Sequence, residues 1–435
     1  MKEIKIKGID EKIYEHTCKN GLVVYIWPYS LSEECYMTLT VKYGSEHTEF
    51  KIQNKEYTVP NGIAHFLEHI KFNESKDKTA HDFFYKLGSY TNAYTTYDHT
   101  SYEVMCHNQI KENLEHLLYF VLNPYFNKSI IQKEKPIIIE ESKMVLNNPY
   151  NLGFKTLMNN VYKVNKKKNL VTGEKDDIKS ITLDDVKLVF DTFYHPKNMF
   201  LTITGKVNPL EIEKIVEEYF ANIDIPKYVN AEIILPKEPD KVVKEKEDVY
   251  TTVTKEKILA NIKIPKKQYK GISDLHLRIL FNILLSINFG TTSDFNEYLI
   301  QNNIVDDIYG SVSVDKDHII LSCEASTSYP NEVIKLLKEK LHNLKFNEED
   351  FNRKNKTFIA STILGYEDAT EVNNDIRMDI IKYGKITNNI NEVFRNLKYV
   401  DGEDIIKRLK KYEISYVVLK PLESKIWHFA FFIVI

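Results

Sequence analysis

Apolar positions recur with strand-like and helix-like spacing along the first hundred residues. Residues 22–27 and 36–41 are rich in β-branched and aromatic side chains, which favours two strands. Residues 63–72 place apolar side chains at helical intervals between polar ones, which predicts an amphipathic helix. A second helix is predicted within residues 76–87, and residues 90–106 indicate two further strands. The pattern therefore mixes helices and strands from the start.

A helix followed by a strand appears twice, far apart in the chain. Residues 180–206 predict this unit, and residues 399–419 predict it again about 217 residues later. This repeat indicates two copies of one domain. Residues 226–248 contain three prolines and then a charged run, which is typical of a linker. We therefore expect a first domain at 1–225 and a homologous second domain at 249–435.

The predicted helix at 63–72 carries the pattern H-x-x-E-H. At 3.6 residues per turn, His65 and His69 lie on one face, with Glu68 beside them. Two imidazoles suit zinc, and a catalytic zinc needs a third protein ligand and a water molecule. Glu68 is placed to take a proton from that water. The alternative is an amphipathic helix whose histidines and glutamate merely face solvent.

Four ordered stretches resemble the pitrilysin/insulinase metallopeptidases, the inverzincins that include mitochondrial processing peptidase. Residues 62–72, G-I-A-H-F-L-E-H-I-K-F, resemble the active-site helix of that family. Residues 88–95 resemble its G-x-x-x-N-A-x-T edge strand, and residues 134–141 its helix with paired glutamates. Residues 193–199 resemble its F-Y-x-P-x-N-M segment. The family fold implies an α+β protein with two homologous αβ-roll domains, each a mostly antiparallel sheet packed with helices.

The third zinc ligand is expected among three glutamates. Helical geometry alone does not choose between Glu134, Glu140 and Glu141. The family resemblance selects Glu141 as the ligand and Glu134, seven residues earlier, as an accessory catalytic residue that supports the site. Pro136 lacks a backbone N–H, so we expect the helix that carries Glu141 to start or kink there.

The resemblance also assigns substrate binding to Asn92 and Ala93. In the family these positions lie on an edge strand, whose unpaired backbone groups can hold an extended peptide. Such main-chain pairing favours flexible peptides over folded proteins. The alternative is that Asn92 is an ordinary turn residue.

The second half of the chain lacks an H-x-x-E-H pattern. It also lacks the arginine and tyrosine with which the second domain of active family members engages substrate, since Ile300 and Asp307 stand at about those positions. The chain therefore resembles the zinc-bearing subunit of bacterial two-subunit members. We expect a homologous partner subunit that supplies the arginine–tyrosine pair, although a homodimer is possible.

Composition limits the remaining alternatives. The 435 residues carry a formal net charge of −3, which gives no basic surface for nucleic acid. The four cysteines show no C-x-x-C spacing, and no apolar run is long enough to span a membrane. No secretory signal is evident, so we expect a cytoplasmic protein. The apolar stretch 426–435 is expected to form a final core strand, or else a tail that binds a partner or a membrane.

Together these features predict a zinc endopeptidase that hydrolyses short or unfolded peptides with one Zn²⁺ per chain. The ligands are His65, His69 and Glu141, and Glu68 is the general base. The alternative is a catalytically silent structural or assembly subunit of the same family.

Overall fold

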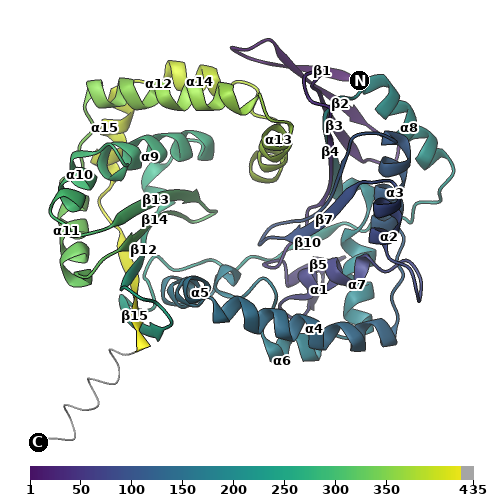
Figure 1. Ribbon diagram of the computed structural model, residues 1–435, viewed down its shortest axis with the longest axis horizontal. Coiled ribbons are helices and arrows are strands. Elements are labelled where there is room, and N and C mark those ends of the chain that lie inside the picture. The colour runs from purple at the N-terminus through teal and green to yellow at the C-terminus, as the bar shows by residue number, and fades with distance from the viewer. Residues whose placement is uncertain (423–435) are drawn as a thin grey trace, which may run out of the picture. The chain divides into compact units, whose positions relative to one another are not determined.

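The computed structural model describes residues 1–422, which form two compact units (Figure 1). The first unit comprises Met1–Ser142, Leu170–Leu235 and Ser361–Glu392. The second comprises Lys143–Asn169, Pro236–Ala360 and the chain from Val393 onward. Each unit is thus built from three separate segments of the chain. The predicted limits of the duplicated domains, 1–225 and 249–435, stay a prediction, and the predicted strand at 426–435 lies outside the described residues.

The first unit is built on a seven-stranded sheet with the order β1-β2-β3-β9-β4-β8-β7. All neighbouring strands are antiparallel except β3 and β9. A small three-stranded sheet, β10-β5-β6, accompanies it. The strands of this unit are β1 (Lys2–Ile6), β2 (Glu11–Thr17), β3 (Val23–Pro28), β4 (Cys35–Val41), β5 (Glu49–Ile52), β6 (Lys55–Thr58), β7 (Tyr90–Thr95), β8 (Thr100–Cys106), β9 (Met199–Gly205) and β10 (Ala231–Ile233).

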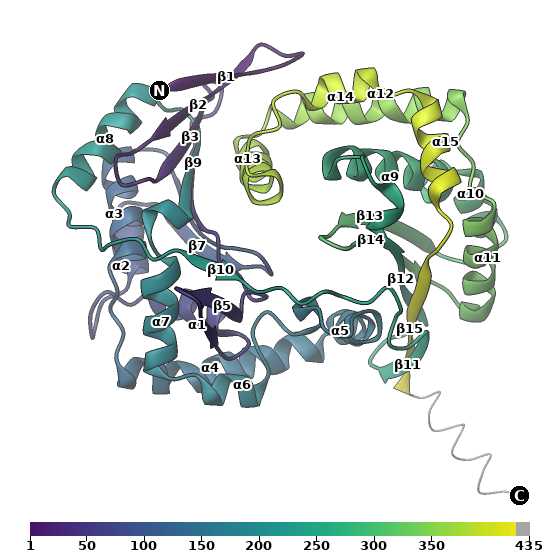
Figure 2. The same ribbon diagram turned by 180° about the vertical axis from the view of Figure 1, so that it is seen from behind.

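Helices cover both faces of the seven-stranded sheet. Successive side chains of a strand point to opposite faces, so each strand contacts the helices on both sides. In β4, Met37 and Leu39 join the larger apolar core beneath α1, α3 and α7, whereas Thr38 points to the other face. On that face Thr38 donates a hydrogen bond to Asn373 of α13, so α13 lies against β4 and β9 (Figure 2). The helices of the unit are α1 (Ile63–Lys71), α2 (Ala80–Lys86), α3 (Ile110–Leu122), α4 (Lys128–Asn147, whose last turn enters the second unit), α6 (Lys175–Ser180), α7 (Leu183–Phe193), α8 (Pro209–Ala221) and α13 (Ala369–Tyr383).

Helix α13 completes a second, smaller apolar core on its face of the sheet. Tyr25, Trp27 and Phe200 of the sheet are buried there against Val372 and Ile376 of α13. The helix comes from a segment more than 130 residues beyond the last strand of the unit, β10. The first unit therefore includes a helix from the second half of the chain.

The second unit repeats the strand order of the first. Its five-stranded sheet, β11-β15-β12-β14-β13, matches β3-β9-β4-β8-β7 strand for strand, and only its first pair, β11 and β15, is parallel. This match confirms the predicted α+β fold with two homologous domains. The elements are α5 (Pro149–Val161), β11 (Lys246–Thr251), β12 (Lys257–Pro265), α9 (Asp274–Phe289), α10 (Asp294–Gln301), β13 (Asp307–Val314), β14 (His318–Ser326), α11 (Pro330–His342), α15 (Tyr399–Arg408) and β15 (Glu413–Pro421), with α12 (Glu348–Gly365) and α14 (Ile390–Asn396) each shared with the first unit.

A buried ion pair lies at the centre of the second unit. The Lys263 Nζ atom of β12 donates to the Glu238 carboxylate at 2.8 Å, and both side chains are almost fully buried. Glu238 also accepts backbone N–H hydrogen bonds from Lys163, Val164 and Asn165. The carboxylate thus joins the segment predicted as a linker to the loop after α5.

Candidate active site

Helix α1 presents His65, Glu68 and His69 from a nearly buried position. It begins after Gly62, whose φ of 81° lies in the left-handed region that favours glycine. The apolar side chains between the polar positions anchor the helix in the core of the first unit; they are Ile63, Phe66, Leu67 and Ile70, each at most 1% exposed. The core thus fixes the direction in which the three polar side chains point.

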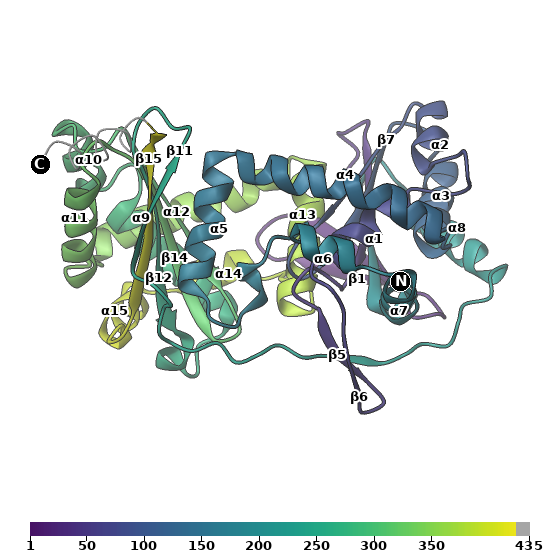
Figure 3. The same ribbon diagram turned by 90° about the horizontal axis from the view of Figure 1, so that it is seen from below.

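Helix α4 passes beside α1 (Figure 3), and its Glu141 meets both histidines of α1. Its carboxylate oxygens lie 3.4 Å from His65 Nε2 and 3.2 Å from His69 Nε2. Charge-assisted hydrogen bonds are about 2.7–2.9 Å long, whereas two ligands of one tetrahedral zinc, each roughly 2.0–2.1 Å from the ion, lie roughly 3.3–3.4 Å apart. The two nitrogens and the carboxylate therefore fit a zinc ion better than they fit direct hydrogen bonds.

Two carboxylates beside His69 raise its pKa and orient its ring. The two imidazoles hold the pKa of Glu141 well below its usual value. Burial opposes the charge of His69, but Glu134 and Glu141 together raise its pKa to about 10. Glu134 Oε1 lies 3.0 Å from His69 Nδ1, which leaves Nε2 directed at Glu141. A carboxylate on the far nitrogen is the usual support of a metal-binding histidine.

Glu68 faces the same point from within α1. Its ligand-type oxygen lies within 4.8 Å of the ring nitrogens of His65 and His69. The side chain is 7% exposed, and burial raises its pKa although His65 opposes this shift. Thr95 Oγ1, on β7, donates a 2.6 Å hydrogen bond to Glu68 Oε2. Thr95 thus holds one of the two carboxylate oxygens of Glu68.

A close backbone contact sets the spacing between α1 and α4. A Cβ atom on Gly62 would lie 2.4 Å from the carbonyl oxygen of Thr172 and 2.7 Å from Cα of Gly173. The Gly173 carbonyl in turn accepts a hydrogen bond from Ser142 Oγ, next to Glu141 in α4. The turn at Thr172 and Gly173 therefore touches both helices that carry the candidate ligands.

Helix α4 runs without interruption from Lys128 to Asn147, with Pro136 inside it. Of the two alternatives expected at Pro136, a helix start is excluded, and a kink stays a prediction. Proline there removes one backbone hydrogen bond and its ring crowds the carbonyl four residues earlier, but the first two turns persist because Ile131 is buried in the core and Asn127 accepts the N–H groups of Ser129 and Ile130. Glu134 is therefore helical and reaches His69.

Strand β7 lies at one edge of the seven-stranded sheet and packs against α1. Asn92 and Ala93 occupy its middle; Asn92 is exposed and Ala93 packs partly against the core. Neither residue lies in a turn, so the alternative that Asn92 is a turn residue is excluded. The edge leaves one row of backbone groups of β7 without a partner strand among the described residues.

Two further residues of the first unit were not assigned from sequence. Thr95 belongs to the N-A-x-T motif, but only the structure shows its hydrogen bond to Glu68. Arg377 of α13 places its guanidinium 5.0 Å from the ring centroid of Tyr94 in β7. The motif spacing contained a signal for Thr95, whereas no local pattern joins Arg377 to a strand almost 300 residues away.

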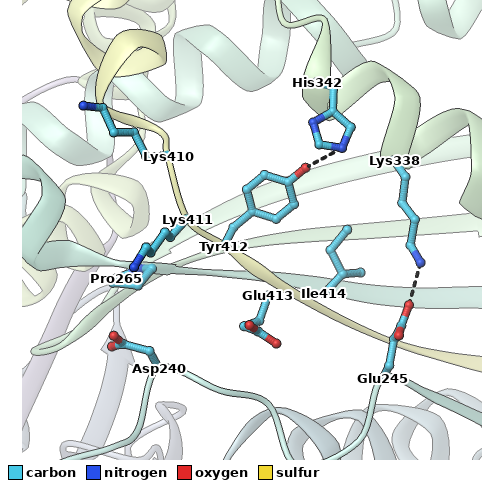
Figure 4. Close-up of a pocket in the computed structure, with 10 residues that line it drawn as sticks. All are labelled: Asp240, Glu245, Pro265, Lys338, His342, Lys410, Lys411, Tyr412, Glu413 and Ile414. Carbon is cyan, nitrogen blue, oxygen red and sulfur yellow. Dashed lines mark hydrogen bonds and ion pairs between the residues drawn. The ribbon is translucent and has the colours of Figure 1, made fainter.

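The second unit carries no comparable cluster in the part of the chain that is described: both groups of potential metal ligands lie in the first unit. Ile300 falls in α10 and Asp307 begins β13. A surface hollow of about 560 Å³ does occur in this unit, but Lys338 there pairs with Glu245, and Tyr412 bonds to His342 (Figure 4). It contains charges of both signs and none of the predicted site residues.

No helix within residues 1–422 is long and apolar enough to cross a membrane.

Two family models match the chain. The model described as "Insulinase (Peptidase family M16)" matches residues 29–175, and "Peptidase M16 inactive domain" matches residues 180–357. The second match begins at residue 180, within the first of the two domains expected from the sequence, so the limits 1–225 and 249–435 stay a prediction.

Individual proteins give the same result. "Uncharacterized zinc protease YmfH" of Bacillus subtilis is 32% identical over 314 residues, which cover 71% of this chain and 72% of that protein. "Probable mitochondrial-processing peptidase subunit beta" of Schizosaccharomyces pombe is 26% identical over 48% of this chain and 45% of its own length. The crystal structure of a putative M16-like peptidase from Alicyclobacillus acidocaldarius has a TM-score of 0.89 and 22% identity, covering 96% of this chain and all of that one. The chain therefore belongs to the insulinase family of peptidases, family M16.

Proposed function

We propose that this chain is a zinc endopeptidase that cleaves short or unfolded peptides. The observation that carries the proposal is the group of His65, His69 and Glu141, in which the Glu141 oxygens lie 3.4 Å and 3.2 Å from the two ring nitrogens, with Glu68 beside it. The zinc protease names of several relatives support the choice of metal. A zinc ion held by these three residues supplies Lewis acidity, which lowers the pKa of water and polarises the scissile carbonyl.

The side chains of the chain carry the proton transfers. Glu68 accepts a proton at its free carboxylate oxygen and then passes it to the leaving amine, while Thr95 holds the other oxygen. Glu134 fixes the ring of His69. Strand β7 holds the peptide through main-chain hydrogen bonds at its unpaired edge, with Asn92 and Ala93 beside the reacting bond. Selection for flexible peptides follows because a folded protein cannot extend along this edge.

The test is Glu68→Gln. The amide keeps the size of the side chain but cannot accept a proton, so we expect zinc content to be retained and kcat to fall by about 10²–10⁴-fold. Glu140→Gln, on the exposed residue next to Glu141, is the matched control and should change neither. Hydrolysis of a quenched fluorescent peptide by Glu68→Gln at near the wild-type rate would refute the general-base role. A wild-type chain that binds no zinc on metal analysis would favour the silent-subunit alternative.

We also propose a homologous partner subunit. The positions of Ile300 and Asp307 lack the arginine–tyrosine pair expected from the family, and three relatives are named as beta subunits of mitochondrial-processing peptidase. Orienting a substrate can contribute about 7–11 kcal/mol to catalysis, so the chain alone should be orders of magnitude slower than with its partner. The assay compares the chain alone with the chain plus a homologous subunit that carries either arginine or alanine. Full activity of the chain alone would refute this role and would indicate a monomer or homodimer.

A further inference from the structure

A second cluster of metal-binding side chain types lies in the first unit, outside the site described above. His16 is in β2, and Cys18 follows directly after that strand. Glu213 and Glu217 are one turn apart on α8 and face His16. Figures 1 and 2 both show α8 beside β2. The fold thus brings together two pairs of residues that are about 200 positions apart in sequence.

The ligand atoms of His16, Cys18 and Glu217 lie close enough for one ion. A ring nitrogen, the sulfur and a carboxylate oxygen are all within 4.8 Å of one another. Around a tetrahedral zinc, with bonds of about 2.0–2.3 Å, such atoms lie roughly 3.3–3.6 Å apart. Binding of an ion would have to separate His16 Nε2 from Glu217 Oε1, which are 2.8 Å apart in the metal-free arrangement, and bring Cys18 to the same distance range. Cys18 is 3% exposed, so its sulfur faces the cluster and not solvent.

Glu213 supports His16 in the way that Glu134 supports His69. His16 Nδ1 lies 3.0 Å from Glu213 Oε1, and His16 Nε2 lies 2.8 Å from Glu217 Oε1. In the active site, Nδ1 of His69 also lies 3.0 Å from a carboxylate, and Nε2 faces the ligand glutamate. A carboxylate on Nδ1 leaves Nε2 as the nitrogen that binds a metal.

We propose that His16, Cys18 and Glu217 form a second metal site for a divalent ion of the zinc type, with Glu213 as the carboxylate that orients His16. The mixture of sulfur, nitrogen and oxygen suits such an ion and excludes calcium or magnesium, which require oxygen ligands. The ion joins the end of β2 to α8. Its role is structural, because it would link two elements of the fold and shares no residue with the candidate active site.

Without a metal, the ring of His16 bridges the two carboxylates, and Cys18 is a buried thiol beside it. The two arrangements differ in the state of the sulfur. A metal requires the thiolate, and a cobalt ion bound to thiolate gives an intense charge-transfer band in the near ultraviolet. Since His65, His69 and Glu141 include no sulfur, this band reports on the second site alone.

The experiment is titration of the metal-free full chain with Co²⁺, followed by absorbance and metal analysis. We expect two ions per chain and the thiolate band. Cys18→Ser should remove the band and leave one ion, whereas Cys323→Ser, at a buried cysteine of the second unit, should change neither. A His65→Ala/His69→Ala variant should keep the band and bind one ion.

Two more variants keep the proposal testable if Cys18→Ser folds poorly. Glu217→Gln should also abolish the band, and Glu213→Gln should weaken cobalt binding by about 10–100-fold while the band remains at saturation. Circular dichroism of each variant checks the fold. One ion per chain without a thiolate band, or a band that survives Cys18→Ser, would overturn the proposal. The outcome is independent of peptidase activity, because the active site is measured separately by the His65→Ala/His69→Ala variant.

Discussion

Gly62→Ala should damage the active site through the backbone. At a φ of 81°, alanine costs about 1–2 kcal/mol relative to glycine. The new Cβ atom would also lie 2.4–2.8 Å from backbone atoms of Thr172 and Gly173. These atoms cannot rotate away as a side chain could, so α1 or the turn must shift, which costs roughly 1–3 kcal/mol more. We therefore expect a total loss of about 2–5 kcal/mol in the free energy of unfolding.

Gly88→Ala separates the two contributions. Gly88 also has a left-handed φ, 68°, but a Cβ atom there would meet nothing within 4 Å. It should cost only about 1–2 kcal/mol. Denaturant unfolding of both variants gives the difference, which is the cost of the steric contact.

The same variants test the link between this contact and catalysis. A shift of about 1 Å in α1 relative to α4 would reduce kcat by up to about 10²-fold in Gly62→Ala, and zinc affinity should fall with it. Gly88→Ala should keep both near wild type. If the two variants unfold at the same denaturant concentration and hydrolyse peptides equally, the close packing of Gly62 on Gly173 does not position the site.

Three other outcomes follow from individual contacts. Glu141→Ala should release zinc on dialysis far more than Glu140→Ala, because Glu141 meets both histidines. Equal zinc losses by metal analysis would show that Glu141 is not the third ligand. Burial lowers the pKa of His47 from 6.5 to about 4. The folded state therefore binds a proton at His47 less readily than the unfolded state does. Up to about 3 kcal/mol of the free energy of unfolding, present above pH 6.5, should be lost as the pH falls to 4. His47→Asn, which keeps an acceptor for the N–H of Gly44, should abolish that part of the pH dependence in unfolding experiments, and an unchanged slope would contradict the assignment. Glu238→Gln leaves a buried ammonium group without its counter-charge and should lower the free energy of unfolding of the second unit by about 3–5 kcal/mol; a loss below 1 kcal/mol would show that the pair is solvated.

Short-range patterns in the sequence contained much of the fold and most of the candidate site. The strands expected at 22–27 and 36–41 are β3 and β4 within one residue, and the late helix and strand are α15 and β15. The pattern at 63–72 predicted α1 because three turns of apolar residues repeat there. The duplicated order of strands agrees with the two copies inferred from the sequence.

Other features of the fold could not be predicted from local sequence patterns, because they depend on contacts with other parts of the structure. Pro136 indicated a helix start or a kink, and the start was wrong because burial and capping in the first turns of α4 outweigh the cost of the proline. Nothing local shows that α13 belongs to the first unit, since its partners are strands more than 150 residues earlier. His16 and Cys18 carry no metal-binding spacing of their own until α8 adds two glutamates.

The late position of α13 also has a consequence for the order of folding during synthesis. The strands of the first unit are complete by Leu235, but the helix that covers Tyr25, Trp27 and Phe200 begins at Ala369. At ribosomal rates of about 5–20 residues per second, that helix follows roughly 7–25 seconds later. During this interval the nascent sheet exposes an aromatic surface to which chaperones can bind and through which chains can aggregate. The unit that carries the candidate catalytic residues therefore reaches its final fold only after most of the second unit has been made.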